Sequence, residues 1–226
     1  MSTASEEPKS EFPLQPIEVV SVLAALGLVA AHLVRFALVP EVWGWHFFAL
    51  VFAGLVAADF VSGVTHWAGD TWGTEATPGF GSRFIRPFRF HHAQPLNMLR
   101  SNFFTTNGDT ALASLPFLVL PFASPLDREW GRVAAVFVWA VGAWGMWTSQ
   151  FHRWAHTKNP PRVVGWLQRH GLILSQAHHA RHHKVPFVAN YCITTGWCDG
   201  VLTRVRFFPA MEWCVSRLTG LRPSRG

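Results

Sequence analysis

Long apolar segments constrain this chain more than any other feature. Residues 17–39 and 43–67 can each cross the hydrocarbon core of a bilayer, which takes about 20 helical residues. Residues 132–154 form another such segment, and residues 111–122 form a shorter one with two prolines. Hydrophobic residues make up 50% of the chain and charged residues only 14%, which is typical of membrane proteins. We therefore predict an all-α integral membrane protein with about four transmembrane helices.

The two ends of the chain differ from this apolar middle. Residues 1–16 are polar and acidic and lack the basic region of a signal peptide, so we expect a disordered acidic tail. Residues 17–208 are expected to form the membrane domain. Residues 209–226 are expected to form a C-terminal amphipathic segment or tail.

The distribution of basic residues predicts the orientation. The connection between the second and third segments holds four arginines, and the chain from Arg153 onward holds eleven Lys and Arg against two acidic residues. The two opposite connections are short and poor in basic residues. Because basic loops stay in the cytoplasm, we expect both termini and the middle connection on the cytoplasmic face of a multi-pass protein.

Nine of the twelve histidines fall at this same face and predict a histidine-rich cytoplasmic cap. The other three, His32, His46 and His170, are isolated and are expected to be structural or exposed. The nine are His66, His91, His92, His152, His156, His178, His179, His182 and His183.

The spacing of these histidines suits metal binding. His152 and His156 lie four residues apart on one helical face, as do His66 and Asp70. The adjacent residues His91 and His92 would point about 100° apart in a helix, so that they could serve two metals or one ligand and its support. One such spacing arises easily by chance, but several on one membrane face predict a metal centre.

Eight imidazoles with no neighbouring cysteine are enough for two ions. Imidazole suits iron, copper, nickel and zinc. Two iron ions that react with O2 fit a lipid-embedded enzyme best, because unactivated C–H bonds need a strong oxidant. We prefer His179 to His178 as a ligand, because it shares a helical face with the next two histidines. The predicted ligands are His66, His91, His92, His152, His156, His179, His182 and His183, with His178 as a support.

Several polar residues are candidates for secondary roles. Asp70, Asn190 and Asp199 could supply an oxygen ligand or orient an imidazole. An aspartate such as Asp59 is costly inside an apolar segment, so it either pairs helices or serves the site. Asn107 and Asp109 could cap the third segment. The candidates for contact with substrate or its headgroup are Asp59, Arg86, Arg89, Asn107 and Asp109.

Six strings resemble one known family. They are "SGVTHWAGDTWG", "FIRPFRFHHAQP", "TNGD", "QFHRWAHT", "HHARHH" and "YCITTGWCDG", and the match covers roughly residues 58–205. They resemble the plasmanylethanolamine desaturase family, also called the Kua or CarF-type membrane lipid desaturases.

The resemblance implies a diiron membrane desaturase, to which residues 17–208 would correspond. Such enzymes use O2 and external electrons to convert the 1-O-alkyl ether of plasmanylethanolamine to the vinyl ether of a plasmalogen. Related chloroplast members desaturate an acyl chain of phosphatidylglycerol instead. The expected partners are a membrane phospholipid and a ferredoxin or cytochrome b5-type electron donor. We expect no nucleic-acid partner.

The chain departs from the family pattern at two places that bear on the substrate. Phe90 stands where members often have an acidic residue, and Ser101 and Asn102 stand where they often have a His-Asp pair. The alternative enzyme is a desaturase or hydroxylase of fatty acyl, sterol or carotenoid substrates. The non-enzymatic alternatives are a heme b electron-transfer protein, which would need histidine pairs at mid-membrane depth, and a metal transporter, which would need ligands along the spans.

Overall fold

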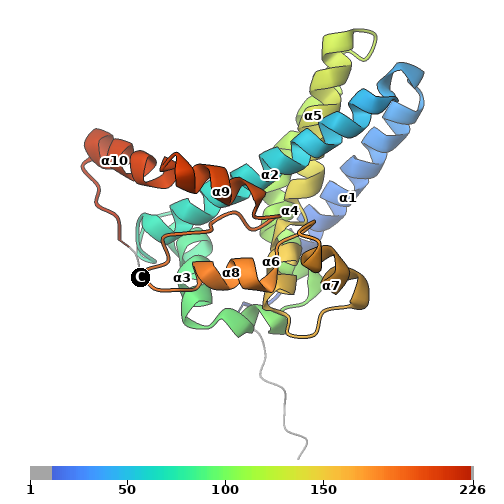
Figure 1. The fold of residues 1–226 in the computed structure, drawn as a ribbon. Helices are drawn as coiled ribbons and strands as arrows, with labels where there is room; N and C mark the ends of the chain where they lie inside the picture. The colour runs from blue at the N-terminus through green and yellow to red at the C-terminus, as the bar shows by residue number, and fades with distance from the viewer. Residues whose placement is uncertain (1–11, 225–226) are drawn as a thin grey trace, which may run out of the picture.

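Four long helices form a bundle in the computed structural model, which describes residues 12–224 (Figure 1). Helix α1 packs against α4, α2 packs against α5, and α4 also contacts α5. Every regular element within the described range is helical, which confirms the all-α prediction. The four helices are α1 (Pro16–Ala37), α2 (Trp45–Thr71), α4 (Phe103–Val119) and α5 (Glu129–Gly145).

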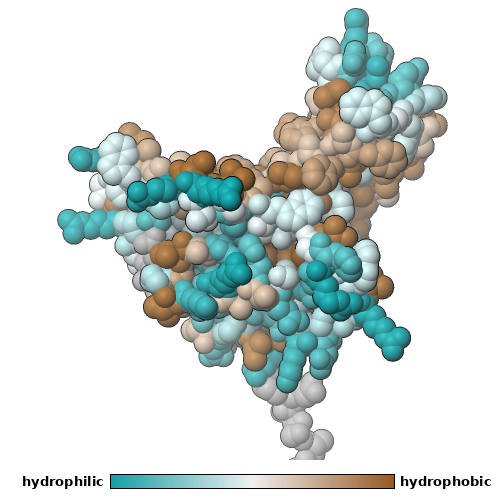
Figure 2. Space-filling model, viewed as in Figure 1, coloured by the Kyte–Doolittle hydropathy of each residue, from teal (hydrophilic) through white to brown (hydrophobic). Residues whose placement is uncertain are grey.

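The surface of the bundle is largely apolar (Figure 2). Helices α1 and α2 are each long and apolar enough to cross a membrane. Helices α4 and α5 have 17 residues each. At 1.5 Å per residue they are about 26 Å long, somewhat shorter than a hydrocarbon core of about 30 Å. Figure 2 shows apolar residues along the bundle and hydrophilic residues at its upper tip and over the lower part of the molecule.

The third apolar segment, predicted at residues 111–122, belongs to helix α4. This helix begins at Phe103, so it is longer than predicted. The side chain of Asn102 accepts a hydrogen bond from the Thr105 backbone N–H and caps α4 at its N-terminus. Asn107 and Asp109 were expected to act as caps, but both lie inside α4. The 3-10 turn η4 (Leu120–Ala123) follows at the other end.

The fourth apolar segment is not one helix. Helix α5 ends at Gly145 and α6 (Thr148–His156) begins after two residues in a turn. The Trp147 N–H bonds the Trp144 carbonyl, which is a three-residue step that interrupts the α-helical pattern. This break separates the histidines of α6 from the bundle helix α5.

Short helices surround the end of the bundle that carries the histidines. In Figure 1, α3, α6, α7 and α8 lie below the bundle, and α9 and α10 extend to the left. The bounds are η1 (Pro40–Val42), η2 (Gly81–Ile85), α3 (Arg86–Ala93), η3 (Pro95–Arg100), α7 (Arg162–Arg169), α8 (Gln176–His182), α9 (Trp197–Arg204) and α10 (Phe207–Thr219).

The predicted ends of the membrane domain, residues 17 and 208, both lie within helices. The predicted boundary at residue 208 falls inside α10, where Phe208 packs against Trp67 and Tyr191, so α10 belongs to the same packed unit. Most of the predicted tail, residues 1–11, lies outside the described residues. The Phe12 ring meets the Phe90 ring edge-on at 5.5 Å, and Pro16 already belongs to α1.

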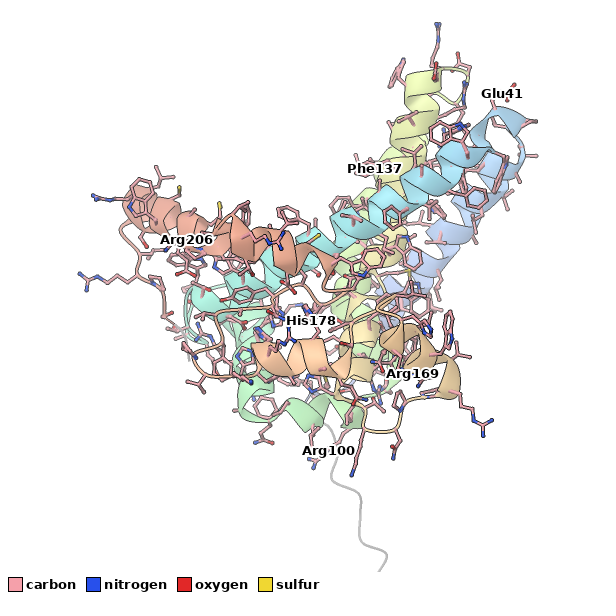
Figure 3. The ribbon with its side chains drawn as sticks, in the orientation of Figure 1. Glu41, Arg100, Phe137, Arg169, His178 and Arg206 are labelled. Atoms are coloured by element: carbon pink, nitrogen blue, oxygen red, sulfur yellow. The ribbon has the colours of Figure 1, made fainter. Side chains whose placement is uncertain are left out.

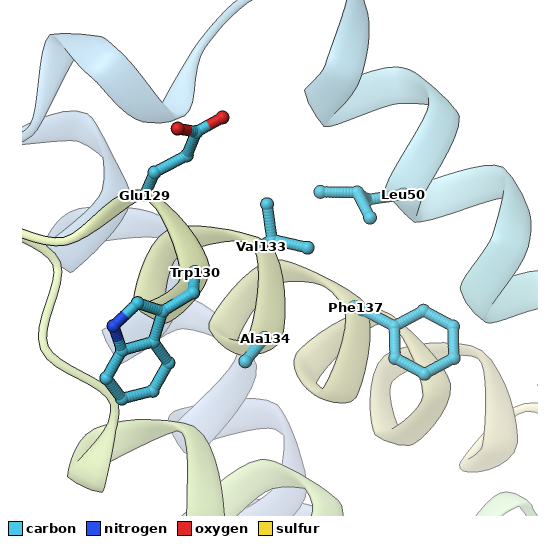
Figure 4. Close-up of a pocket in the computed structure, with 6 residues that line it drawn as sticks. All are labelled: Leu50, Glu129, Trp130, Val133, Ala134 and Phe137. Atoms are coloured by element: carbon cyan, nitrogen blue, oxygen red, sulfur yellow. The ribbon is translucent and has the colours of Figure 1, made fainter.

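A shallow groove lies between α2 and α5, away from the histidines (Figure 4). Leu50 of α2 faces Val133 and Phe137 of α5 across it, and Trp130 and Glu129 lie at one end. Its apolar lining is typical of a surface that faces lipid chains.

Candidate metal centre

Two groups of ligand atoms converge beside α8, near the residue labelled His178 in Figure 3. Within each group the candidate ligand atoms all lie within 4.8 Å of one another. The five-histidine group consists of His91, His152, His156, His179 and His183. The Asp70 group consists of His66, Asp70, His92 and His182. Together the groups hold all eight predicted histidine ligands.

The five-histidine group brings together three helices. Its Nε2 atoms come from α3, α6 and α8 with its C-terminal cap residue His183. The His152 and His179 Nε2 atoms lie 2.7 Å apart, those of His179 and His183 lie 3.0 Å apart, and those of His91 and His156 lie 3.1 Å apart. Two nitrogens bound at right angles to one ion at about 2.1 Å would lie about 3.0 Å apart. The spacing therefore fits a shared ion.

The Asp70 group joins α2 to the same two helices, α3 and α8. Asp70 Oδ2 lies 3.5 Å from His66 Nε2, 3.7 Å from His92 Nε2 and 3.3 Å from His182 Nε2. The His92 and His182 Nε2 atoms are 2.9 Å apart. Asp70, His66 and His182 are at most 2% exposed, so this group is buried more completely than the five-histidine group.

Backbone carbonyls orient two of these imidazoles. His66 Nδ1 lies 3.0 Å from the Tyr191 carbonyl, and His182 Nδ1 lies 2.9 Å from the Ala189 carbonyl. Each Nδ1 must carry the proton to donate to a carbonyl, which leaves the Nε2 lone pair facing the group. His66 Nε2 is buried and makes no hydrogen bond in the structure. Since buried polar atoms normally have a partner, this nitrogen fits a metal ion.

The protonation states also suit metal binding. Burial, with repulsion among the histidines as a smaller cause, lowers the pKa of His92 and His156 to about 3 and that of His183 to about 4. The same causes lower the pKa of His91 and His179 well below the ordinary value for histidine. These imidazoles are therefore neutral at pH 7, which is the form that binds a metal.

The structure separates the two adjacent histidine pairs in different ways. His91 lies in the five-histidine group and His92 in the Asp70 group, so that the pair serves both groups. His179, and not His178, lies among the converging nitrogens. His178 Nε2 instead lies 2.7 Å from Asp199 Oδ2.

Asp199 and Asn190 hold the segment beside α8. Asp199 Oδ1 accepts the Cys192 backbone N–H, and the Asn190 side chain donates to the His178 carbonyl. Neither residue belongs to the two groups. Of the three residues that could have supplied an oxygen, only Asp70 lies where it could contact the ion directly.

Asp59 holds the loop before α9 in place. It is fully buried, and its carboxylate accepts the backbone N–H groups of Thr195, Gly196 and Cys198 at 2.7, 2.9 and 3.0 Å. Ser62, one turn further along α2, accepts the Ile193 N–H at 3.0 Å. Together they fix the loop before α9 against α2, because a buried carboxylate needs such donors.

Asn107 likewise has a structural role, because it is buried and donates to Gln150 and to the Phe103 carbonyl. Exposed Asp109 forms an ion pair with Arg83 at 2.6 Å. The Arg86 guanidinium lies 5.5 Å from the centre of the Phe12 ring. Headgroup contact by Asp109, Arg86 and Arg89 stays a prediction.

Arg153 connects three elements beside the site, a role that the sequence did not indicate. Its guanidinium donates to the carbonyls of Leu99 and Ser101 and to the Thr106 hydroxyl. It thus ties η3 and α4 to α6, between the two histidines of that helix. The carbonyls of Ala189 and Tyr191 gave no sequence signal at all, because any residue supplies one.

The three remaining histidines lie outside the site, as expected. His32 is buried and its Nε2 lies 2.9 Å from the Leu118 carbonyl. His46 is half-buried and His170 is exposed, and each contacts a nearby backbone carbonyl.

Comparison with known proteins identifies the family. The lipid desaturase domain matches residues 55–225. The chain is 40% identical to plasmanylethanolamine desaturase of Myxococcus xanthus over 93% of its own length and 75% of that protein. It is 38% identical to plasmanylethanolamine desaturase 1 of Mus musculus, over 90% of its own length and 78% of that protein.

One relative from a plant is named as a fatty acid desaturase. The chain is 38% identical to chloroplastic fatty acid desaturase 4 of Arabidopsis thaliana, over 76% of its own length and 52% of that protein. No solved structure matches the chain. The chain belongs to the lipid desaturase family and is thus a membrane oxidoreductase, with histidine groups that are compatible with a metal site.

Proposed function

We propose that this protein is an O2-dependent desaturase that converts the 1-O-alkyl ether of plasmanylethanolamine to the vinyl ether of a plasmalogen. The observation that carries the proposal is the convergence of eight histidines and Asp70 in two adjacent groups. Identities of 40% and 38% to two proteins named plasmanylethanolamine desaturase support the substrate.

The proposed cofactor is a pair of iron ions, one in each group. Bound iron would supply the means to activate O2 for breaking an unactivated C–H bond. The chain's own part is to hold neutral imidazoles in place, and the Tyr191 and Ala189 carbonyls fix two of them by their Nδ1 protons. The proposed ligands are His66, His91, His92, His152, His156, His179, His182 and His183, with Asp70 as an oxygen ligand.

The reaction removes one hydrogen from each of two adjacent carbons of the alkyl chain. O2 accepts these two hydrogens, together with two electrons and two protons from outside, and becomes two waters. A ferredoxin or cytochrome b5-type protein is the proposed donor, and the arginine-rich end of the molecule is the proposed docking surface for this acidic partner. The two carbons must lie close to the centre, because their position decides where the double bond forms.

The proposed topology has four spans, with both termini and the metal centre on the cytoplasmic face. Two observations support it. Arg83 donates to the Gln15 side chain at 3.2 Å, so the start of α1 lies beside the connection from α2 to α3. The Ser224 N–H donates to the Thr71 carbonyl at 2.8 Å, so the end of the chain also returns to this side.

A fatty acyl chain on another phospholipid is the second candidate substrate. The similarity to chloroplastic fatty acid desaturase 4 favours it. Phe90, Ser101 and Asn102 depart from the pattern of the family at positions next to the site or in the segment that Arg153 holds.

Lipid analysis tests the proposal. The protein is produced in a host that makes alkyl ether phospholipids but lacks its own enzyme for vinyl ethers. Acid-labile vinyl ethers should appear with the protein and not with an empty vector. New double bonds in acyl chains without vinyl ethers would support the second candidate, and an unchanged lipid profile with an electron donor present would contradict both.

A further inference from the structure

The two groups of ligand atoms differ in charge. The five-histidine group offers five imidazoles that carry no charge in their metal-binding form. The Asp70 group offers three imidazoles and one carboxylate. A divalent ion would therefore keep its full double charge in the first group, whereas the carboxylate would neutralise half of it in the second.

The two groups also differ in the number of donors. Two donor atoms that each lie about 2.1 Å from one ion are about 3.0 Å apart when the donor–ion–donor angle is a right angle. They are about 3.4 Å apart when that angle is tetrahedral. In the five-histidine group, the Nε2 atoms of His152 and His179 are 2.7 Å apart and those of His152 and His156 are 3.3 Å apart. Asp70 Oδ2 lies 3.3–3.7 Å from its three histidine neighbours. The His92 and His182 Nε2 atoms of the Asp70 group are also only 2.9 Å apart, so the groups are separated by their donors, five nitrogens in one and three nitrogens with one carboxylate in the other.

The position of Asp70 is consistent with this difference. Its side chain is 2% exposed and its Oδ2 faces His66, His92 and His182. An ion at this position would have the Asp70 carboxylate and three imidazole nitrogens as its donors.

From these observations we infer that the two metal positions are unequal and that Asp70 defines one of them. The Asp70 position is a four-donor site whose anionic ligand favours the higher oxidation state of the ion. The five-histidine position has only neutral donors and favours the lower one. The inference rests on the proposed function, because it presumes that both groups bind a metal, and it assigns the carboxylate to one ion alone.

Cobalt is a suitable probe, because Co²⁺ with four tetrahedral donors absorbs visible light far more strongly than Co²⁺ with five or six. The full-length protein is purified in detergent, stripped of metal and titrated with Co²⁺. Two ions should bind per chain, and only one of them should bring the strong visible band. A wild-type protein whose two ions bind with the same spectrum would overturn the inference, and so would one that binds no cobalt. This measurement needs no variant to fold.

Variants assign the band to a position. Asp70→Asn should bind one Co²⁺ per chain and lose the strong band, and His183→Ala should keep the band. Asp109→Asn is the control, since its exposed carboxylate lies outside both groups, and it should match wild type in the number of cobalt ions bound and in their spectrum. Two cobalt ions with an unchanged band in a folded Asp70→Asn protein would overturn the assignment. Far-UV circular dichroism checks that each variant is folded.

The cobalt titration and the lipid assay fail separately. A protein with two unequal cobalt positions that forms no vinyl ether would contradict the proposed substrate and leave the inference standing. A protein that forms vinyl ethers but has two identical cobalt positions would contradict the inference alone.

Discussion

The Nε2 atoms of His92 and His182 lie 2.9 Å apart, although 90 residues separate them in the chain. One belongs to α3 and the other to α8, and Asp70 of α2 lies within 3.7 Å of both nitrogens. Three short stretches of sequence therefore meet at one point, and each can be tested by removing one side chain.

Removal of His182 should abolish turnover. His182→Ala deletes one of the four donors of the Asp70 group, and loss of a proposed ligand should lower activity by at least about 100-fold. Vinyl ether formation in cells and metal content of the purified protein measure the effect. The protein should still insert into the membrane, so its amount in the membrane fraction is compared with wild type. Full activity would rule out His182 as a ligand.

Removal of His178 should have a different result. Its ring contacts Asp199 and not the converging nitrogens, so His178→Gln should keep both metals. It should lower the thermal stability, because Asp199 loses its partner and α8 is held less firmly. Metal content and melting temperature are measured together. A loss of metal as large as that in His182→Ala would show that His178 is a ligand.

The loop before α9 should depend on the charge of Asp59. Asp59→Asn keeps the shape of the side chain but weakens three hydrogen bonds, and we expect the free energy of unfolding to fall by about 1.5–3 kcal/mol. Thermal unfolding in detergent measures the change. Asp109→Asn is the matched control, since exposed ion pairs contribute about 0–1 kcal/mol. Equal stability of the two variants would contradict the role of Asp59.

The close packing of α2 against α5 should leave no room for a side chain at position 54. A Cβ atom there would lie 2.5 Å from the Ala140 Cβ and 3.0 Å from the Ala140 backbone, so Gly54→Ala must push α5 away. Overpacking of this kind costs about 1–3 kcal/mol. Gly27→Ala, where nothing lies within 4 Å, should leave the melting temperature unchanged or raise it. A Gly54→Ala protein as stable as wild type would contradict the observed packing.

Acid should destabilise the metal-free protein. The pKa is about 3 for His92 and His156 and about 4 for His183 in the folded chain, all below the ordinary 6.5. Between these values the unfolded chain binds more protons than the folded one, so the free energy of unfolding falls as the pH decreases from about 6.5 toward 3. Melting temperatures of metal-free protein across this range measure the effect. A melting temperature that rises toward acid pH would contradict these pKa values.

Bound metal should oppose this loss of stability in the upper part of the same range. Metal binds only the neutral imidazoles, so protons and metal compete for the same nitrogens. The loaded protein should therefore stay folded to a lower pH than the metal-free protein. Identical pH profiles for the two forms would indicate that the ion is not bound at these histidines.

The sequence by itself determined much about this protein. The apolar segments predicted an all-helical chain, because a helix in a membrane satisfies its own backbone hydrogen bonds. The structure confirms this prediction over the residues it describes. The spacing of His152 and His156, and of His66 and Asp70, predicted shared helical faces, and both pairs lie on such faces in the structure. These features are local, so a stretch of a few residues is enough to reveal them.

Only the tertiary structure decided how the histidines divide between two groups. The split of His91 from His92, and of His182 from His179 and His183, depends on how α3 and α8 lie against α2 and α6. The sequence also could not tell that Asp59 binds the backbone of residues 195–198, more than 130 positions away. These relationships arise from long-range packing and from backbone carbonyls and N–H groups. Every residue type but proline carries both groups, so the order of side chains leaves no trace of them.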